Sequence, residues 1–350
     1  MTAVVLTLGE VGTEDALASL RRQTLPPHEV VLVRGVSPFH QAVNSGARQV
    51  ATPFFVQVDA DMILDPDCLA ELRRLVEEDS GIVVGQLRDA LIGRVVGIKL
   101  FRTAPFREVL MADTISPDTD LGRALARGGW KTVYAGRPPQ HDPEAWRTYG
   151  EHRPDYGPDY TYRKYLMEGR RYRYRRNPDG IRWHFGRLEA SRHASAVIAQ
   201  VALANGIFLE SEQDLLGRLE TDAAFAGLVG FLAAPGDAGP EATASLPLAG
   251  SLQESFRGYY ERGRSLFRAG AFASFDKLLG SLSGCHKSEA ALVAKVGLCR
   301  GLLEPDREPR MLAADFRVLE EFLAATPRDG ALRGFVARLG RWFRRRSSAS

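Results

Sequence analysis

The chain has 350 residues, 45% of them hydrophobic and 25% charged, with a net charge of +3 at pH 7. This size and apolar content suffice for more than one core, so two domains are expected. The small charge gives no sign of nucleic-acid binding, and the three cysteines form neither a disulfide framework nor a zinc pattern. No signal-peptide pattern and no run of about 18 apolar residues occurs, so a cytoplasmic, non-membrane-spanning protein is expected.

The N-terminal part alternates between apolar runs and amphipathic stretches. The predicted elements are, in order, strand 3–8, helix 14–23, strand 29–33, helix 38–50, a strand from Phe54, and helix 68–78. Thr13 is predicted to cap the first helix. The alternation predicts an α/β fold with a mostly parallel sheet and helices on both faces, whose ligands lie beyond the carboxyl ends of the strands.

Two carboxylates stand where the third strand ends. Asp59 and Asp61 follow the apolar run that begins at Phe54, and a turn of the backbone there lets both side chains converge on one cation. Oxygen ligands suit Mg²⁺ or Mn²⁺, which keep positions open for phosphate oxygens. The alternative is a polar strand end without a metal, since this short motif is common.

Several blocks occur together in a characteristic order. They are 19–33 (SLRRQTLPPHEVVLV), 44–47 (NSGA), 58–64 (VDADMIL), 117–121 (PDTDL) and 127–131 (RGGWK). In this order and at these separations they resemble the inverting glycosyltransferases of family 2, which have the GT-A fold. The resemblance covers roughly residues 3 to 145.

The resemblance implies a catalytic base, which removes the proton from the attacking acceptor hydroxyl. Asp118 aligns with this base, although Pro117 replaces the glutamate that usually precedes it. Asp120 is expected either to orient the site or to cap a helix that starts at Leu121. Asp113, in the loop that leads into this block, is the competing candidate for the base.

The resemblance also implies a histidine as a third contact to the metal or the diphosphate. His141 follows a predicted strand at 130–134 and a turn-rich segment, so it is the candidate ligand. The alternative is a solvated loop histidine. His184 is the only rival considered among the other histidines.

Four predicted donor-binding residues lie at the ends of the first three strands, namely Thr7, Gly9, Arg34 and Asp59. The fifth, Asn44, belongs to the 44–47 block that carries the resemblance. The family usually has two acidic residues and Gly-Ser after the second strand, where this chain has Arg34-Gly35-Val36-Ser37. Arg34 is therefore expected to contact the base or a phosphate, and the nucleotide of the donor stays open. Thr7 and Gly9 alternatively only form the turn.

A basic, tyrosine-rich segment follows the expected catalytic domain at residues 160–176. Arginine forks suit phosphates, and tyrosines suit sugar rings or a membrane interface. Arg170, Arg171 and Arg173 are thus expected to contact a lipid-diphosphate acceptor. The alternative is a solvated helix face.

Beyond residue 186 only helical patterns occur. They lie at 190–209, 213–219, 223–232, 252–269, 271–282, 288–303, 313–325 and 330–346. The expected organisation is a catalytic domain at 1–150, a connecting or acceptor-side segment at 151–189, and an all-α domain at 190–350 with a linker at about 235–250. The basic, amphipathic last helix either packs on its neighbours or contacts a membrane surface.

The sequence therefore predicts a metal-dependent inverting hexosyltransferase, with Mn²⁺ or Mg²⁺ as cofactor. It would move a sugar from a nucleotide-sugar donor to a glycan, lipid-linked or protein-linked hydroxyl, as in polysaccharide biosynthesis, in the cytoplasm or at the inner face of the membrane. The alternative is a non-catalytic protein of the same fold whose helical domain is a scaffold. A nucleotidyltransferase is disfavoured because 8–12 (LGEVG) contains no basic residue.

Overall fold

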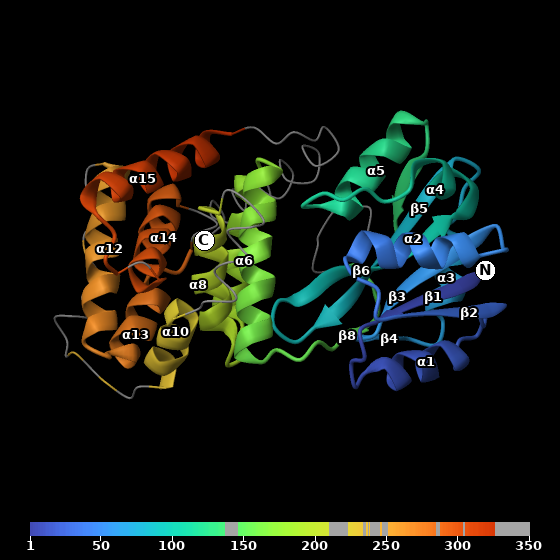
Figure 1. The fold of residues 1–350 in the computed structure, drawn as a ribbon, viewed down its shortest axis with the longest axis horizontal. Helices are drawn as coiled ribbons and strands as arrows, with labels where there is room; N and C mark the ends of the chain where they lie inside the picture. Colours follow the sequence, from blue (N-terminus) through green and yellow to red (C-terminus); the bar gives the residue numbers. More distant parts are fainter. Residues whose placement is uncertain are drawn as a thin grey trace, which may run out of the picture. The chain divides into compact units, whose positions relative to one another are not determined.

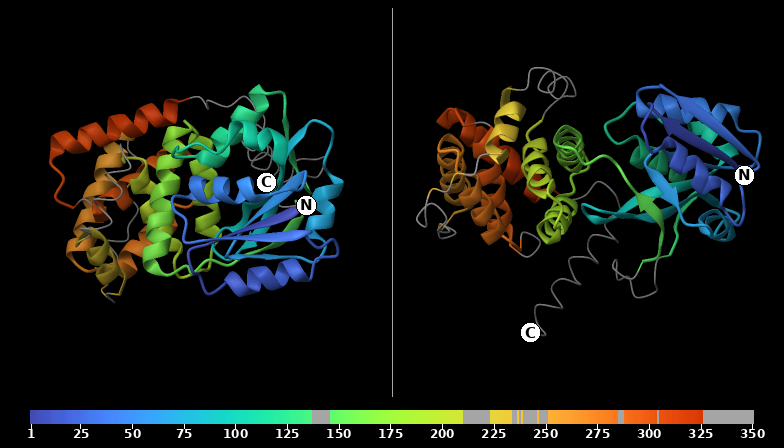
Figure 2. Two further views of the ribbon diagram at one scale, coloured as in Figure 1. Left: turned by 45° about the vertical axis from the view of Figure 1, so that its right-hand side comes forward. Right: turned by 90° about the horizontal axis from the view of Figure 1, so that it is seen from below.

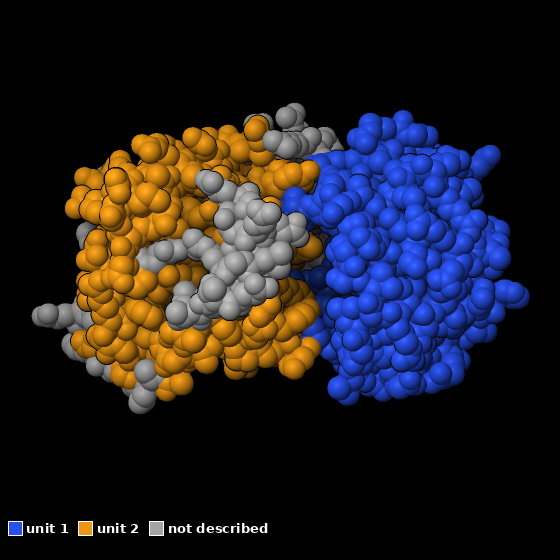
Figure 3. Space-filling model, viewed as in Figure 1, with its two compact units in different colours: residues 1–154 blue, residues 155–350 orange. Residues whose placement is uncertain are grey.

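The computed structural model describes residues 1–136, 146–209, 223–233, 236, 238, 246, 251–284, 288–303 and 305–325. The chain divides into two compact units, Met1–Pro154 and Asp155–Ser350 (Figure 3). Within the described ranges, no helix combines the length and apolarity that crossing a bilayer requires.

The first unit is built around a mixed sheet (Figure 1). Its elements are β1 (Thr2–Thr7), α1 (Thr13–Arg21), β2 (Glu29–Arg34), α2 (Phe39–Gln49), β3 (Phe54–Asp59), β4 (Met62–Leu64), α3 (Cys68–Arg74), β5 (Ser80–Asp89), β6 (Gly93–Arg102), α4 (Thr103–Val109), α5 (Pro117–Arg127), β7 (Lys131–Tyr134) and β8 (Thr148–His152). The strand order is β2-β1-β3-β6-β5-β8-β4, and β7 pairs with β5.

This sheet combines parallel and antiparallel pairs. The pairs β1–β2, β1–β3, β5–β7 and β5–β8 are parallel. The pairs β3–β6, β5–β6 and β4–β8 are antiparallel. The α/β class expected from the sequence, with helices on both faces of the sheet, is confirmed. The hairpin of β5 and β6 and strand β8 were not among the predicted elements.

The two faces of the sheet carry separate hydrophobic cores. Successive side chains of a strand point to opposite faces, so Val4 and Val5 of β1 belong to different cores. One core contains residues of α1 and α3, and the other contains residues of α2, α4 and α5. Helices therefore cover both faces of the sheet, as Figures 1 and 2 show.

Three local predictions in this unit were wrong. Thr13 is the first residue of α1 rather than its cap; the cap position is Gly12, and no side chain caps the helix. Helix α3 ends at Arg74, because the following residues turn toward β5 and the hydroxyl oxygen of Ser80 accepts a 2.9 Å hydrogen bond from the Glu77 amide. Helix α5 starts at Pro117, where proline suits the first turn of a helix.

The described part of the second unit contains helices and no strand, which confirms the all-α prediction. The helices are α6 (Pro158–Tyr174), α7 (Pro178–Ala190), α8 (Ala196–Gly206), α10 (Ala223–Ala233), α12 (Leu252–Arg268), α13 (Phe272–Ser281), α14 (Glu289–Leu303) and α15 (Pro309–Ala324). The predicted helices at 213–219 and 330–346 and most of the predicted linker lie outside the described residues.

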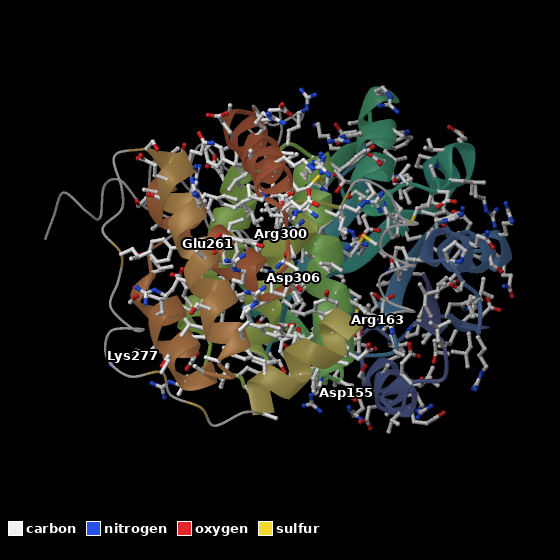
Figure 4. All side chains as sticks on the ribbon, turned by 60° about the vertical axis from the view of Figure 1, so that its left-hand side comes forward. Asp155, Arg163, Glu261, Lys277, Arg300 and Asp306 are labelled. Atoms are coloured by element: carbon white, nitrogen blue, oxygen red, sulfur yellow. The ribbon has the colours of Figure 1, made fainter. Side chains whose placement is uncertain are left out.

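Glycines and buried ion pairs fix the packing of these helices. A Cβ atom on Gly169 of α6 would lie 2.2 Å from the carbonyl oxygen of Leu203 in α8, so this close helix contact requires glycine. Arg300 lies among the helices (Figure 4) and donates a 2.9 Å hydrogen bond to Asp315, both almost fully buried. Separating buried charges is costly, so this pair, together with the 2.6 Å ion pair of Arg307 with Asp315, favours one arrangement of α14 and α15.

Candidate active site

The carboxylates predicted to bind metal lie where β3 ends. Asp59 is its last residue and Asp61 follows one residue later, before β4 begins. Gln57 Nε2 donates a 2.9 Å hydrogen bond to Asp59 Oδ1. Burial, reinforced by the charge of Asp61, raises the pKa of Asp59 to about 6. A cation bound between these two carboxylates would relieve the repulsion between their charges.

His152, which was not among the site residues predicted from the sequence, lies beside this pair. The register of β4 and β8 places it opposite Met62, the residue after Asp61. Its Nε2 atom is 3.2 Å from Asp61 Oδ2, and its side chain is 10% exposed. The backbone reinforces the placement, since the Arg153 amide donates a 2.7 Å hydrogen bond to the Asp61 carbonyl oxygen.

Asp89 orients this histidine from the other side. It ends β5 and is the register partner of His152 in the parallel pair of β5 and β8. Its fully buried carboxylate accepts a 2.6 Å hydrogen bond from His152 Nδ1 through Oδ2. Its Oδ1 accepts hydrogen bonds from the Leu91 and Ile92 amides at 2.9 and 2.8 Å. The β5–β6 turn thus locks Asp89, and Asp89 in turn fixes the histidine ring.

This arrangement fits a divalent cation. With Nδ1–H donated to Asp89, the lone pair of His152 Nε2 faces Asp61 Oδ2, and two acceptors at 3.2 Å require a proton or a cation between them. Adjacent ligands of an octahedral ion lie roughly 3 Å apart when each bond is about 2.1 Å. Among the described residues, no group of three or more His, Cys, Asp or Glu side chains is arranged to enclose a metal ion. Mg²⁺ commonly takes one or two carboxylates and completes its shell with substrate phosphates.

The other two histidines considered from the sequence do not take this place. His141 lies outside the described residues. His184 is buried in the second unit, where its Nδ1 shares a 2.9 Å hydrogen bond with the Tyr172 hydroxyl. Its ring also contacts Tyr165. His184 is a core residue of the helices, because an aromatic cluster surrounds it.

Asp118 lies in the first turn of α5. Its Oδ2 is 2.8 Å from Lys99 Nζ on β6. Its Oδ1 is buried and has no hydrogen-bond partner among the described residues. A buried carboxylate oxygen without a partner is costly unless a ligand supplies one. One oxygen of the predicted base is thus paired with Lys99, and the other is buried without a partner among the described residues.

The other two acidic residues considered for this role lie differently. The side chain of Asp113 is 78% exposed and is 3.4 Å from His40 Nδ1. Asp120 was expected to orient the site or to cap a helix. The cap prediction was wrong because α5 begins three residues earlier, at Pro117. Asp120 instead forms an ion pair of 2.6 Å with Arg123, one turn further along the same helix.

The loop after β1 closes over the β3–β4 turn. Glu10 accepts 2.7 Å hydrogen bonds from the Thr7 hydroxyl and the Leu8 amide. The Gly9 amide donates to the Thr7 hydroxyl oxygen, and Gly9 has a positive φ of 107°. A Cβ on Gly12 would lie 2.8 Å from the carbonyl oxygen of the residue between the two aspartates. The Thr7 hydroxyl is therefore used to shape this loop, next to the carboxylates.

Asn44 and Arg34, two further predicted donor-binding residues, have different surroundings. Asn44 is buried, and its amide exchanges hydrogen bonds of 2.8 and 2.9 Å with the backbone of Met111. It therefore anchors the loop that leads to α5. Arg34 is exposed at the end of β2, where it is the register partner of Thr7. No described residue forms an ion pair with it.

The predicted acceptor-side arginines lie on α6 in the second unit. Arg171 forms an ion pair with Glu168, and Arg173 donates a 3.1 Å hydrogen bond to the Ile207 carbonyl oxygen. Arg170 is half-buried. The interleaved tyrosines 162, 165 and 172 are buried. The suggestion that the tyrosines of this segment stack on sugars or lie at a membrane was therefore wrong for these three, because the helix uses them for packing. Tyr160 and Tyr174 are exposed, and for them it stays a prediction.

No protein-family model matches the chain, and no curated protein matches it. Among solved structures, the chain is similar to the mannosyltransferase PcManGT from Pyrobaculum calidifontis in complex with GDP-Man and Mn²⁺, at 15% identity over 92% of this chain and 86% of that one, with a TM-score of 0.39. S. aureus TarS 1–349 is 12% identical over 88% of this chain and 93% of that one, with a TM-score of 0.34. The 2-C-methyl-D-erythritol 4-phosphate cytidylyltransferase from Thermus thermophilus matches 39% of this chain and 90% of its own, at 17% identity and a TM-score of 0.27.

Proposed function

We propose that the chain is a metal-dependent inverting glycosyltransferase of family 2. The observation that carries the proposal is a pair of separate acidic centres in the first unit. Asp61 with His152 forms one, and Asp118, whose buried Oδ1 has no partner among the described residues, forms the other. An inverting transfer needs a cation for the leaving diphosphate and a separate base for the acceptor.

Asp61 and His152 are proposed to hold the metal together with phosphate oxygens of the donor, and Asp59 is proposed to add its negative charge beside them. When bound, Mn²⁺ or Mg²⁺ would neutralise the charge that develops on the departing nucleoside diphosphate. Arg34, exposed at the end of β2, is proposed to contact the nucleotide or its phosphates. The loop formed by Thr7, Gly9 and Glu10 is proposed to shape the donor side of the site.

Asp118 is proposed to act on the acceptor. Its Oδ1 accepts the proton of the acceptor hydroxyl while that oxygen forms a bond to the anomeric carbon of the sugar. The bond from this carbon to the diphosphate breaks, and the nucleoside diphosphate leaves with the electron pair. Attack on the face opposite the leaving group inverts the configuration at the anomeric carbon.

The acceptor is proposed to be a hydroxyl of a glycan or of a lipid-linked or protein-linked sugar, and the reaction is proposed to take place in the cytoplasm or at the inner face of the membrane. The basic residues of α6 support the proposal of a lipid-diphosphate acceptor, although Arg171 and Arg173 also have contacts within their own unit. Nucleic acid is not proposed as a partner.

A panel of UDP-, GDP- and other nucleotide sugars tests the activity through the release of nucleoside diphosphate with Mn²⁺. We expect turnover of one donor, and its complete loss in EDTA. Asp61→Ala should abolish Mn²⁺-dependent binding of the corresponding nucleoside diphosphate, measured by calorimetry, without unfolding the chain. Unchanged metal-dependent binding in this folded variant would end the metal assignment.

Two matched substitutions test the base. Asp118→Asn preserves the shape of the side chain but removes the proton acceptor, so turnover should fall by roughly 10² or more while donor affinity changes little. Asp113→Asn should lower turnover far less, because that side chain is exposed and lies next to His40. The opposite pattern would move the assignment to Asp113.

A further inference from the structure

The sheet changes from an apolar core to a polar site within one step along β3 and β6. Phe55 and Phe101 are cross-strand partners, and their rings stack at 5.1 Å between centroids. The next pair on the same face consists of Gln57 and Lys99. Gln57 is 1% exposed, and the Lys99 side chain is 12% exposed. The buried amide of Gln57 and the nearly buried ammonium of Lys99 thus lie directly beside the packed rings of Phe55 and Phe101.

Each member of this cross-strand pair contacts a different carboxylate. Gln57 Nε2 donates to Asp59 Oδ1 at 2.9 Å, and Lys99 Nζ is 2.8 Å from Asp118 Oδ2. Burial is the main cause of the raised pKa of Asp59. The charge of Lys99 lowers this pKa, and the charge of Asp118 raises it. The pair therefore lies between the metal-side carboxylate and the base.

The helix that carries Asp118 is anchored to the same core. Leu121 and Leu125 of α5 pack with Phe55 and Phe101, and Asp118 lies one turn before Leu121 on the same side of the helix. The first turn of a helix favours a negative charge through its dipole, but this does not select a direction for the carboxylate. Within the described part of the chain, the ion pair with Lys99 is the contact that gives the Asp118 carboxylate a direction.

We propose that Lys99 is a positioning residue for the base. By holding Oδ2 of Asp118, the ammonium turns Oδ1 toward the acceptor hydroxyl, and the cross-strand pair of Gln57 and Lys99 fixes the spacing between the donor-side carboxylate and the base. Lys99 donates no proton to the reaction and acts only through Asp118. This inference rests on the proposed glycosyl transfer.

The test is a double-mutant cycle in the full-length chain. Lys99→Met keeps the length of the side chain but removes its charge, so the rate of nucleoside diphosphate release at saturating donor should fall by about 10-fold or more. The Michaelis constant for the donor and the calorimetric affinity for Mn²⁺ with nucleoside diphosphate should change less than about 2-fold. Lys99→Arg should restore much of the rate because it keeps the charge.

The decisive measurement is the combination of Lys99→Met with Asp118→Asn. If Lys99 acts only through Asp118, the double variant should be no slower than Asp118→Asn alone. Lys131→Met is the matched control, since it removes a lysine from a surface ion pair with Asp79 at 2.5 Å. The control should match the wild-type rate. If Lys99→Met does not fold, Lys99→Gln is used in the same cycle.

Three results would overturn this inference while leaving the transferase activity in place. One is a normal rate in Lys99→Met beside a slow Asp118→Asn. Another is a double variant whose losses multiply. The third is a parallel loss of thermal stability and nucleotide binding in Lys99→Met, which would show a structural role. Absence of turnover by the wild-type chain with every donor would instead overturn the proposed function, and this inference with it.

Discussion

Asp89→Asn tests how the candidate metal site is held together. The asparagine side chain has the same shape, and its oxygen can still accept the Leu91 and Ile92 amides that now donate to Asp89 Oδ1. Its NH₂ group must then face His152 Nδ1, where a carboxylate oxygen now accepts at 2.6 Å. Two donors cannot face each other at this distance, so the imidazole must carry its proton on Nε2 instead. That nitrogen then has no lone pair to offer a metal.

The size of the effect follows from the number of ligands affected. Removing the partner that orients a metal-bound histidine typically costs 10- to 100-fold in metal affinity. This range corresponds to about 1.4–2.7 kcal/mol, because each factor of ten is about 1.4 kcal/mol. Asp59 and Asp61 are unchanged by the substitution, so weakened rather than abolished binding is expected. The loss of folding stability should be small, because the asparagine oxygen still accepts the Leu91 and Ile92 amides of the turn.

Titration of the full-length chain with Mn²⁺, followed by electron paramagnetic resonance, measures this affinity without any substrate. Asp65→Asn is the control, since it removes a carboxylate that pairs with Arg88 at 2.9 Å on the surface. The control should bind Mn²⁺ as the wild type does. Wild-type affinity in a folded Asp89→Asn variant would refute the role of His152 as an oriented ligand.

Two further predictions concern pH and the acceptor. The pKa of Asp59 rises from its ordinary 3.8 to about 6 in the folded chain. Ionised Asp59 therefore opposes folding in the absence of metal. This cost in folding free energy is absent below pH 3.8, grows up to about pH 6 and remains at higher pH. Asp59→Asn should therefore raise the melting temperature of the metal-free chain by roughly 2–4 °C at pH 7.5 but leave it unchanged at pH 3.5; an equal rise at both would contradict the assignment. Replacing Arg170, Arg171 and Arg173 with Gln should raise the Michaelis constant for a lipid-diphosphate acceptor, more steeply at low salt. A lower melting temperature with an unchanged constant would instead assign these arginines to folding.

The parts of the site that lie on a single strand or loop were predictable from the sequence. Asp59 and Asp61 follow an apolar run directly, so the pattern that marks the strand also marks its end. Asp118 was placed by resemblance, and the structure gives it the partly buried, lysine-paired surroundings described above. Arg34 was expected at the end of the second strand and is exposed there.

The parts that depend on strand register were not predictable by the same means. His152 meets Asp89 across 63 positions of the chain, and only the pairing of β8 with β5 and β4 brings them together. Lys99 lies on a hairpin that the sequence patterns did not reveal, although its strands are rich in valine. Asn44 was predicted as a donor contact from the 44–47 block that carries the resemblance, whereas its hydrogen-bond partner Met111 lies 67 positions away along the chain.

His152 lies far along the chain from Asp61 and Asp89, and this separation affects how the site is assembled during synthesis. β8 is the last strand of its unit along the chain, so a nascent chain that ends before it can form the β1–β3 strands and the two aspartates but lacks the histidine. Contacts of this range form late, because distant segments must first be brought together. High-affinity Mn²⁺ binding would thus report the completed sheet rather than a folding intermediate, and could be used to follow the last step of its folding.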